Sequence, residues 1–185
     1  MLLPNKSRLA RQLNHGGAEF MQPSLVVMGV SGCGKSTLAA AIAQAQGLPF
    51  LEGDDFHSPE SRSKMKQGVP LTDDDRWSWL DRLGQELRAA TGGLVLACSA
   101  LKRAYRDRLR SADPNLRFVF MQVPQDEAQS RVAARATHFF SATLVDSQFA
   151  TLEPPLDEAD VLVLDATQEV STLQVAVSTW LQRPA

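Results

Sequence analysis

The chain has 185 residues, of which 19 are Lys or Arg and 21 are Asp or Glu, so its formal net charge is −2. The length predicts one domain, and 44% hydrophobic with 22% charged residues is ordinary for a soluble globular protein. This balance of charge provides no basic field for nucleic acid, and no apolar run approaches the length of a membrane span. We therefore expect neither a nucleic-acid nor a membrane partner, and an anionic ligand must be held by a local cluster of donors.

The two cysteines, Cys33 and Cys98, indicate neither a disulfide framework nor a zinc site, and a reduced, cytoplasmic setting is expected. Residues 1–22 carry three basic side chains before their first acid, Glu19. We interpret this segment as a disordered N-terminal extension, and a weak organelle-targeting peptide is the alternative. The single domain is then expected over residues 23–185.

Short apolar runs alternate with stretches of helical periodicity along this domain. In chain order they predict a strand at 25–28, a helix at 35–46, a strand at 50–52, a helix at 60–66 within an otherwise irregular segment, a helix at 76–90, a strand at 94–98, a helix at 102–111, a strand at 116–123, a helix at 125–135, a mobile loop at 137–156, a strand at 161–164 and a helix at 170–181. This alternation predicts a three-layer α/β fold with a five-stranded parallel sheet and helices on both faces. Ligands should bind beyond the carboxyl ends of the strands.

The strongest motif follows the first predicted strand and opens the first predicted helix. It reads Gly29-Val30-Ser31-Gly32-Cys33-Gly34-Lys35-Ser36-Thr37 and satisfies G-x-x-x-x-G-K-[ST], the phosphate-binding P-loop. The glycines let the backbone N–H groups face phosphate oxygens at the positive end of the helix. Lys35 is predicted to reach the β- and γ-phosphates of ATP, and the Ser36 hydroxyl is placed to bind Mg²⁺.

The P-loop alone does not identify the phosphate acceptor. A regulatory GTPase would need an N-K-x-D motif after the loop, whereas the Asn-Lys pair of this chain, Asn5-Lys6, precedes it. The size argues against a large mechanical ATPase. A small kinase is therefore the leading class.

A carboxylate cluster, Glu52-Gly53-Asp54-Asp55, closes the second predicted strand. Glu52 and Asp54 alternate and should share a face, so that one can serve the metal and the other the acceptor hydroxyl. A solvated acidic turn is the alternative. The later run of acids at 73–75 is interpreted as a helix cap, and the Arg76 that follows it stays open as a functional candidate.

Further motifs accompany these two. They are Phe56-His57, Lys64-Met65, G-V-P-L-T-D-D-D-R at 68–76, Trp79-Leu80, C-S-A-L-K-R-A-Y-R-D at 98–107, His138-Phe139-Phe140 and S-Q-F-A-T-L-E-P at 147–154. In this order, and over about residues 24–182, the chain resembles the gluconokinase family. Ser58 stands where a proline usually follows the histidine, and Ser61 where many members carry asparagine. Both changes concern fine substrate contacts and not the class.

The resemblance implies ATP-dependent phosphorylation of D-gluconate at its 6-hydroxyl, on a fold shared with shikimate and nucleoside monophosphate kinases. Asp54 is expected to position or deprotonate that hydroxyl and Glu52 to support Mg²⁺ through water, with the reverse order as the alternative. The substrate contacts expected around the acceptor are Asp54, His57, Lys64, Arg76, Lys102, Arg106 and His138. The resemblance also implies that the protein forms a homodimer.

A lid is expected over about residues 131–155. Arg131 and Arg135 lie four residues apart on one predicted helix face and lead into it, so we expect both to contact phosphate and Arg131 to be catalytic. His138 could instead seat the loop. Two alternatives remain: a kinase of a shikimate- or nucleotide-like acceptor, and a non-catalytic ATP-binding module. Intact Glu52, Asp54 and both arginines argue against the module.

Overall fold

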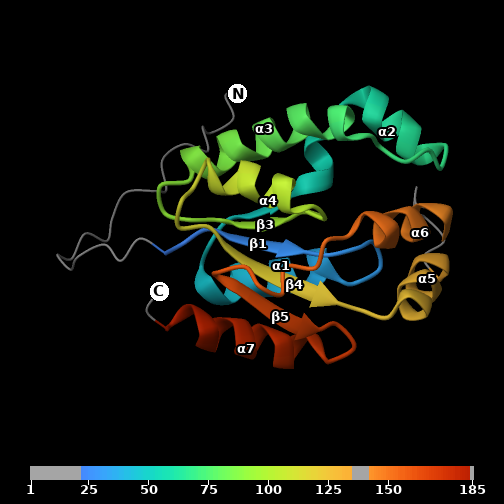
Figure 1. Ribbon diagram of the computed structural model, residues 1–185. Helices are drawn as coiled ribbons and strands as arrows, with labels where there is room; N and C mark the ends of the chain where they lie inside the picture. Colours follow the sequence, from blue (N-terminus) through green and yellow to red (C-terminus); the bar gives the residue numbers. More distant parts are fainter. Residues whose placement is uncertain (1–21, 135–141, 184–185) are drawn as a thin grey trace, which may run out of the picture.

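The computed structural model describes residues 22–134 and 142–183, in which five strands form one parallel sheet (Figure 1). The strands are β1 (Leu25–Met28), β2 (Phe50–Glu52), β3 (Val95–Ala97), β4 (Arg117–Gln122) and β5 (Val161–Asp165). Their order in the sheet is β2-β3-β1-β4-β5, and every neighbouring pair is parallel. The predicted five-stranded parallel sheet is confirmed, with each strand within two residues of its predicted ends.

Helices connect the strands and cover both faces of the sheet (Figure 1). They are α1 (Lys35–Gln46), the 3₁₀ turn η1 (Gly53–Phe56), α2 (Pro59–Lys66), α3 (Asp73–Ala89), α4 (Arg103–Arg110), α5 (Gln125–Ala133), α6 (Ala142–Thr151) and α7 (Val170–Leu181). Among the described residues, no helix has both the length and the apolar character needed to cross a bilayer.

Helix α3 begins three residues before its predicted start, and Thr72 explains why. The Thr72 side chain accepts a hydrogen bond from the Asp75 N–H (3.3 Å), while the Asp75 carboxylate accepts one from the Thr72 N–H (2.8 Å). This reciprocal capping box satisfies backbone donors at the helix start. The three acids therefore lie in the first turn of α3, which confirms their interpretation as N-terminal helix residues.

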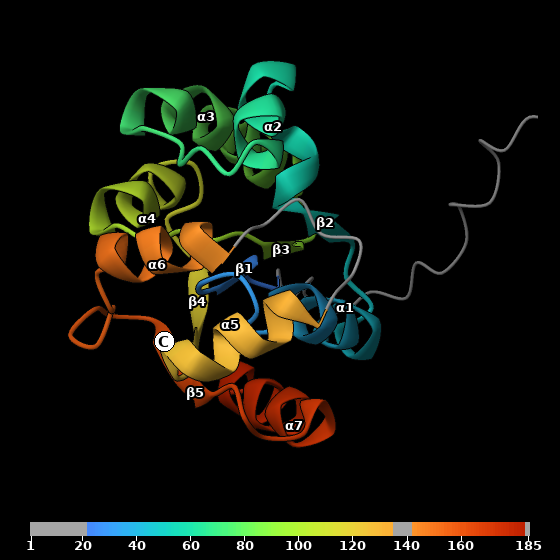
Figure 2. The same ribbon diagram turned by 90° about the vertical axis from the view of Figure 1, so that its right-hand side faces the viewer.

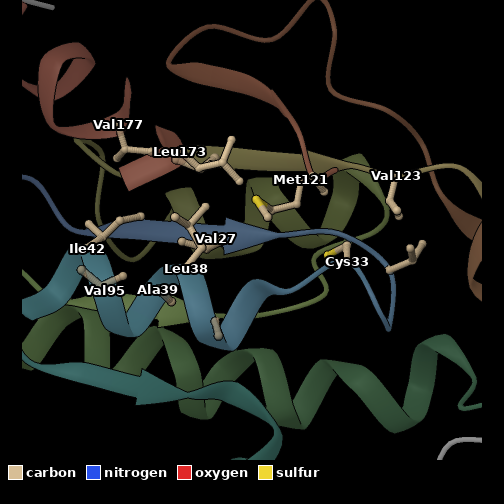
Figure 3. Packing of buried hydrophobic residues seen from close by; sticks show 14 of the residues in the cluster. Val27, Cys33, Leu38, Ala39, Ile42, Val95, Met121, Val123, Leu173 and Val177 are labelled. Atoms are coloured by element: carbon tan, nitrogen blue, oxygen red, sulfur yellow. The ribbon is translucent and has the colours of Figure 1, made fainter. Parts of the chain in front are cut away.

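Two apolar cores sandwich the sheet, because successive side chains of a strand point to opposite faces. Leu25 and Val27 join the core under α1 and α7, where Leu38, Ile42 and Val177 pack against them (Figure 3). The alternate residues of β1 join the second core, under α3 and α4. These two layers hold the carboxyl ends of the strands in fixed register, which is where the predicted site residues lie.

Helices α5 and α6 lie across the carboxyl ends of the strands, close to the loop between β1 and α1 (Figure 2). The predicted loop at 137–156 is wrong for residues 142–151, which form α6. Leu144 and Val145 are buried, and Phe149 and Leu152 pack against the core on the same side. This apolar stripe has helical spacing, so burial against the sheet edge stabilises a helix where a mobile loop was expected.

Candidate active site

The loop between β1 and α1 has the geometry that phosphate binding requires. Gly32 and Gly34 have φ values of 85° and 95°, and Gly34 caps the N-terminus of α1. A Cβ on Gly32 would lie 2.5 Å from the carbonyl oxygen of Ala128 in α5, so both the dihedral and the space demand glycine there. The N–H groups of the loop are thereby gathered at the positive end of α1.

Two donors of this loop are paired within the protein. The Lys35 Nζ donates to the Val30 carbonyl oxygen (3.0 Å), and the Ser31 N–H donates to Oε1 of Gln148 in α6 (2.6 Å). The structure thus brings the predicted phosphate-binding residues together. It also adds Gln148, which belongs to the S-Q-F-A-T-L-E-P motif at 147–154 but was not among the predicted site residues.

Glu52, at the end of β2, lies beside the P-loop. Burial raises the pKa of the Glu52 carboxyl above its usual value, against the opposing effects of a hydrogen bond with Ser36 and the charge of Lys35. The carboxylate and the Ser36 hydroxyl are hard oxygen donors, and Mg²⁺ commonly binds through one or two carboxylates with water and substrate phosphates. The described residues contain no cluster of three or more His, Cys, Asp or Glu suited to a metal. A phosphate-bound Mg²⁺ needs no such cage, so this pair fits it.

A cavity opens between the P-loop, η1, the start of α3 and α6. It is lined by Ser31, Lys35, Asp54, His57, Met65, Pro70, Leu71, Arg76, Ser99, Leu144, Ser147 and Gln148. Its volume is about 30 Å³, room for roughly two water molecules. Three of the predicted acceptor residues, Asp54, His57 and Arg76, therefore share one cavity with Lys35.

Several lining residues were not predicted. Ser99 follows β3, so its position beyond the carboxyl end of a parallel strand was the signal that could have found it. Leu144, Ser147 and Gln148 come from α6, and the helical spacing of the apolar residues in that segment was the corresponding signal.

His57 is a buried, neutral side chain in the wall of this cavity. Its ring stacks on Trp79 with centroids 4.3 Å apart, and its Nε2 lies 3.8 Å from Asp54 Oδ1. Nδ1 is buried without a hydrogen-bond partner among the described residues. Burial lowers the pKa of His57 from 6.5 to about 4. At neutral pH the ring can therefore exchange hydrogen bonds with a hydroxyl but carries no charge for a carboxylate.

We expect the burial of His57 to make stability depend on pH. Between pH 6.5 and pH 4 the unfolded chain binds more protons at this residue, because the folded pKa is about 4. The free energy of unfolding should fall by up to about 3 kcal/mol as the pH drops through this window, and the contribution of His57 should be constant above it. Urea unfolding of the wild type and His57→Gln at pH 7 and pH 4.5 measures it. Equal losses in both proteins would contradict the assignment.

Lys64 is held at the edge of the acceptor region by an ion pair. Its Nζ lies 2.6 Å from Oδ1 of Asp75, and this hydrogen bond is the main reason that the pKa of Asp75 falls to about 2. Lys64 does not line the cavity, although its neighbour Met65 does. Its contact with the acceptor stays a prediction.

Lys102 and Arg76 both lie close to one aromatic ring. The Lys102 Nζ and the Arg76 guanidinium are 5.7 and 5.8 Å from the centroid of Tyr105. Lys102 donates to both carboxylate oxygens of Asp73 (2.8 Å each), and the Tyr105 hydroxyl donates to the same carboxylate (2.5 Å). Arg76 alone of the two cations reaches the cavity lining.

Arg106 is placed away from the acceptor, which corrects its assignment as a substrate contact. The residue is 1% exposed, and its Nε lies 3.0 Å from each carboxylate oxygen of Glu158. Its Nη1 donates to the carbonyl oxygens of Ala100 (2.9 Å) and Leu101 (3.1 Å). Its donors are engaged by the protein and it does not line the cavity, so the geometry gives it a structural role.

Arg131 lies near the carboxyl end of β5. Its Nε donates to Glu127 Oε1 (2.7 Å) and its Nη1 to the carbonyl oxygen of Ala166 (3.0 Å). It does not line the acceptor cavity, and its contact with phosphate stays a prediction. Arg135 and His138 lie outside the described residues.

Comparisons with known proteins show what the chain is similar to. Residues 25–155 match a family described as an AAA domain. The thermoresistant gluconokinase of Escherichia coli (strain K12) is 42% identical over 159 residues, which cover 81% of this chain and 91% of that protein. The gluconokinase of Gluconobacter oxydans (strain 621H) is 46% identical over 142 residues, which cover 75% of this chain and 79% of that protein.

Solved structures show the same likeness. A gluconokinase from Sinorhizobium meliloti 1021 superposes with a TM-score of 0.81 and 43% identity over 87% of this chain and 92% of that one. The APS kinase of Mycobacterium tuberculosis, solved with AMPPNP and APS, has a TM-score of 0.64 at 21% identity, over 88% of this chain and 99% of that one. At that identity the likeness concerns the fold alone.

Proposed function

We propose that this chain, which belongs to the gluconokinase family, transfers the γ-phosphoryl group of ATP to the 6-hydroxyl of D-gluconate and forms 6-phospho-D-gluconate. One observation carries the proposal: Lys35, Asp54 and Arg76 line a single cavity. They supply a cation for the transferred phosphoryl group, an acceptor for the attacking hydroxyl and a cation for the substrate carboxylate.

Asp54 is the better candidate to orient or deprotonate the 6-hydroxyl, because it lines the acceptor cavity. Glu52 stands on the metal side, since it hydrogen bonds with Ser36 of the P-loop. Ser36 directly, and Glu52 through water, would then hold Mg²⁺. Held there, Mg²⁺ would supply positive charge against the negative charge that develops on the phosphate oxygens. This arrangement favours the first of the two orders left open by the sequence.

The P-loop donors and Arg76 are assigned to different substrates. Backbone N–H groups of the loop and Lys35 bind the phosphates of ATP, and Arg76 binds the carboxylate of gluconate. His57, being neutral, exchanges hydrogen bonds with hydroxyl groups. Arg131 and Arg135 are proposed to add positive charge on the nucleotide side. The homodimer and the cytoplasmic setting stay predictions from the sequence.

A panel of acceptors tests the proposed activity. Purified protein with ATP and Mg²⁺ should release ADP rapidly with D-gluconate, and at no more than background rate with shikimate or nucleoside monophosphates. Chromatography of the product should show 6-phospho-D-gluconate. ADP release stimulated by another member of the panel would reassign the acceptor, and ATP binding without stimulation by any acceptor would indicate a binding module.

Asp54→Asn should lower kcat by about 10²- to 10⁴-fold, because the amide cannot take the hydroxyl proton. Affinity for an ATP analogue should change by less than about threefold, since the Asp54 carboxylate is assigned to the acceptor. The neighbouring Asp55→Asn is a matched control, because Asp55 does not line the cavity. The opposite pattern, weak nucleotide binding with kcat retained, would place Asp54 on the nucleotide side.

A further inference from the structure

Gln148 joins the two halves of the site. Its Oε1 accepts the Ser31 N–H at 2.6 Å, and both residues line the acceptor cavity with Asp54 and Arg76. Ser31 belongs to the P-loop, whose N–H groups form the phosphate cradle. The Gln148 carboxamide oxygen therefore accepts the Ser31 N–H at the boundary between the phosphate cradle and the acceptor cavity.

The helix that carries Gln148 is fixed at several points. Val145 is fully buried in the core beside the P-loop, and Asp146 Oδ1 accepts hydrogen bonds from Gln125 (2.8 Å) and Gln129 (2.6 Å) of α5. These contacts anchor α6 against the body of the protein. The Gln148 side chain can rotate while its backbone stays in place, so the Ser31 contact can open without displacement of the helix.

Nucleotide binding favours that opening, because the Ser31 N–H is one of the P-loop donors that face phosphate. A phosphate oxygen that takes the Ser31 N–H must also displace the carboxamide, because one N–H makes one good hydrogen bond. Gln148 lines the cavity together with Asp54 and Ser147, so the displaced carboxamide has both a donor and an acceptor to offer hydroxyl groups there.

We propose that Gln148 is a positioning residue that couples the two substrates: ATP displaces its side chain from the Ser31 N–H, and the freed carboxamide then binds a hydroxyl of the acceptor. The acceptor half of this inference rests on the proposed function, whereas the nucleotide half does not. Coupling of this kind is reciprocal, so each substrate should strengthen the binding of the other.

Calorimetric titration of wild type and Gln148→Ala tests the coupling. In the wild type, D-gluconate should bind about three- to tenfold more tightly when the non-hydrolysable analogue AMPPNP and Mg²⁺ are present, the range of one exchanged hydrogen bond. In Gln148→Ala this ratio should fall to about one, while KM for gluconate rises by a similar factor. A variant that keeps the wild-type ratio and KM would overturn the proposal.

Gln148→Glu provides the second variant and needs no acceptor. A carboxylate at this position should bind the Ser31 N–H more strongly and repel phosphate, so affinity for AMPPNP alone should fall at least about tenfold. Wild-type affinity for AMPPNP would overturn the placement of Gln148 beside the phosphate cradle, whatever the acceptor is. If Gln148→Glu weakens AMPPNP binding as expected but the coupling to gluconate is not observed, the result would instead count against gluconate as the acceptor.

Gln129→Ala is the matched control, because it removes a carboxamide that contacts α6 from outside the cavity. Its coupling ratio should equal that of the wild type. Thermal unfolding of each variant separates loss of fold from loss of coupling. A folded Gln148→Ala protein that keeps the coupling ratio of the wild type would contradict the proposal. If Gln129→Ala loses the ratio as well, the effect belongs to α6 as a whole and the assignment to Gln148 fails.

Discussion

Lys35→Ala is expected to lower kcat with gluconate by at least about a thousandfold, equal to roughly 4 kcal/mol of transition-state stabilisation. The Lys35 ammonium donates to the Val30 carbonyl oxygen of its own loop, and it lines the cavity in which the phosphoryl group is proposed to move. No other side chain of the P-loop motif is a cation, so alanine leaves the developing phosphoryl charge without its nearest compensation. Steady-state ADP release measures the loss.

The same substitution should leave the fold intact. The core under α1 is formed by apolar residues such as Leu38 and Ile42, and the Lys35 side chain adds a hydrogen bond to a carbonyl of its own loop. The temperature of unfolding should therefore shift by only a few degrees. Lys66→Ala, which removes an ammonium group outside the cavity lining, is the matched control and should keep wild-type turnover. A folded Lys35→Ala protein with wild-type kcat would refute the role of the P-loop.

The elements that the sequence predicted well are those whose signal is local. Apolar runs of four residues mark β1 and β4, and the P-loop motif fixes the start of α1 at Lys35. Two of the predicted acceptor residues that line the cavity, Asp54 and Arg76, follow β2 and begin α3, both near the carboxyl edge of the sheet. Placement at that edge follows from topology alone, which is why sequence was sufficient.

The predictions for α6 and Arg106 were wrong because contacts with residues distant in the sequence determine their structure. Helix α6 has an apolar stripe of helical spacing, but it lies within the segment for which a mobile loop was predicted. The burial of Val145 stabilises this segment as a helix. Arg106 stands in a basic segment beside the acceptor motif, so its sequence position indicated a ligand contact. Its true partner, Glu158, lies 52 residues further along the chain, beyond the reach of local pattern.

Glu158→Ala is expected to destabilise the fold by about 3–5 kcal/mol, because it leaves a buried guanidinium without its counter-ion. The Glu158 side chain is 7% exposed and lies 2.8 Å from Arg110 Nη1 as well as contacting Arg106. Burial acts to raise the pKa of Glu158, but the hydrogen bonds from Arg106 and Arg110 together outweigh it and the pKa is lowered. The contribution of this group is therefore present at neutral pH and is lost as the pH falls through its folded pKa.

Loss of the Glu158–Arg106 ion pair should also affect the active site, because Arg106 supports the loop after β3. It holds the carbonyl oxygens of Ala100 and Leu101, and Ala100 has a φ of 42°, a conformation that costs an alanine energy. Ser99 of the same loop lines the acceptor cavity. Glu158→Ala should therefore raise KM for gluconate as well as lower the urea midpoint, both measured at pH 7. The double variant Arg106→Met, Glu158→Leu removes the buried Arg106 guanidinium and its carbonyl contacts, while Arg110 keeps Asp107 as a partner (3.1 Å). It should therefore regain stability and keep the raised KM. Wild-type KM in that double variant would show that the ion pair stabilises the fold without positioning the loop.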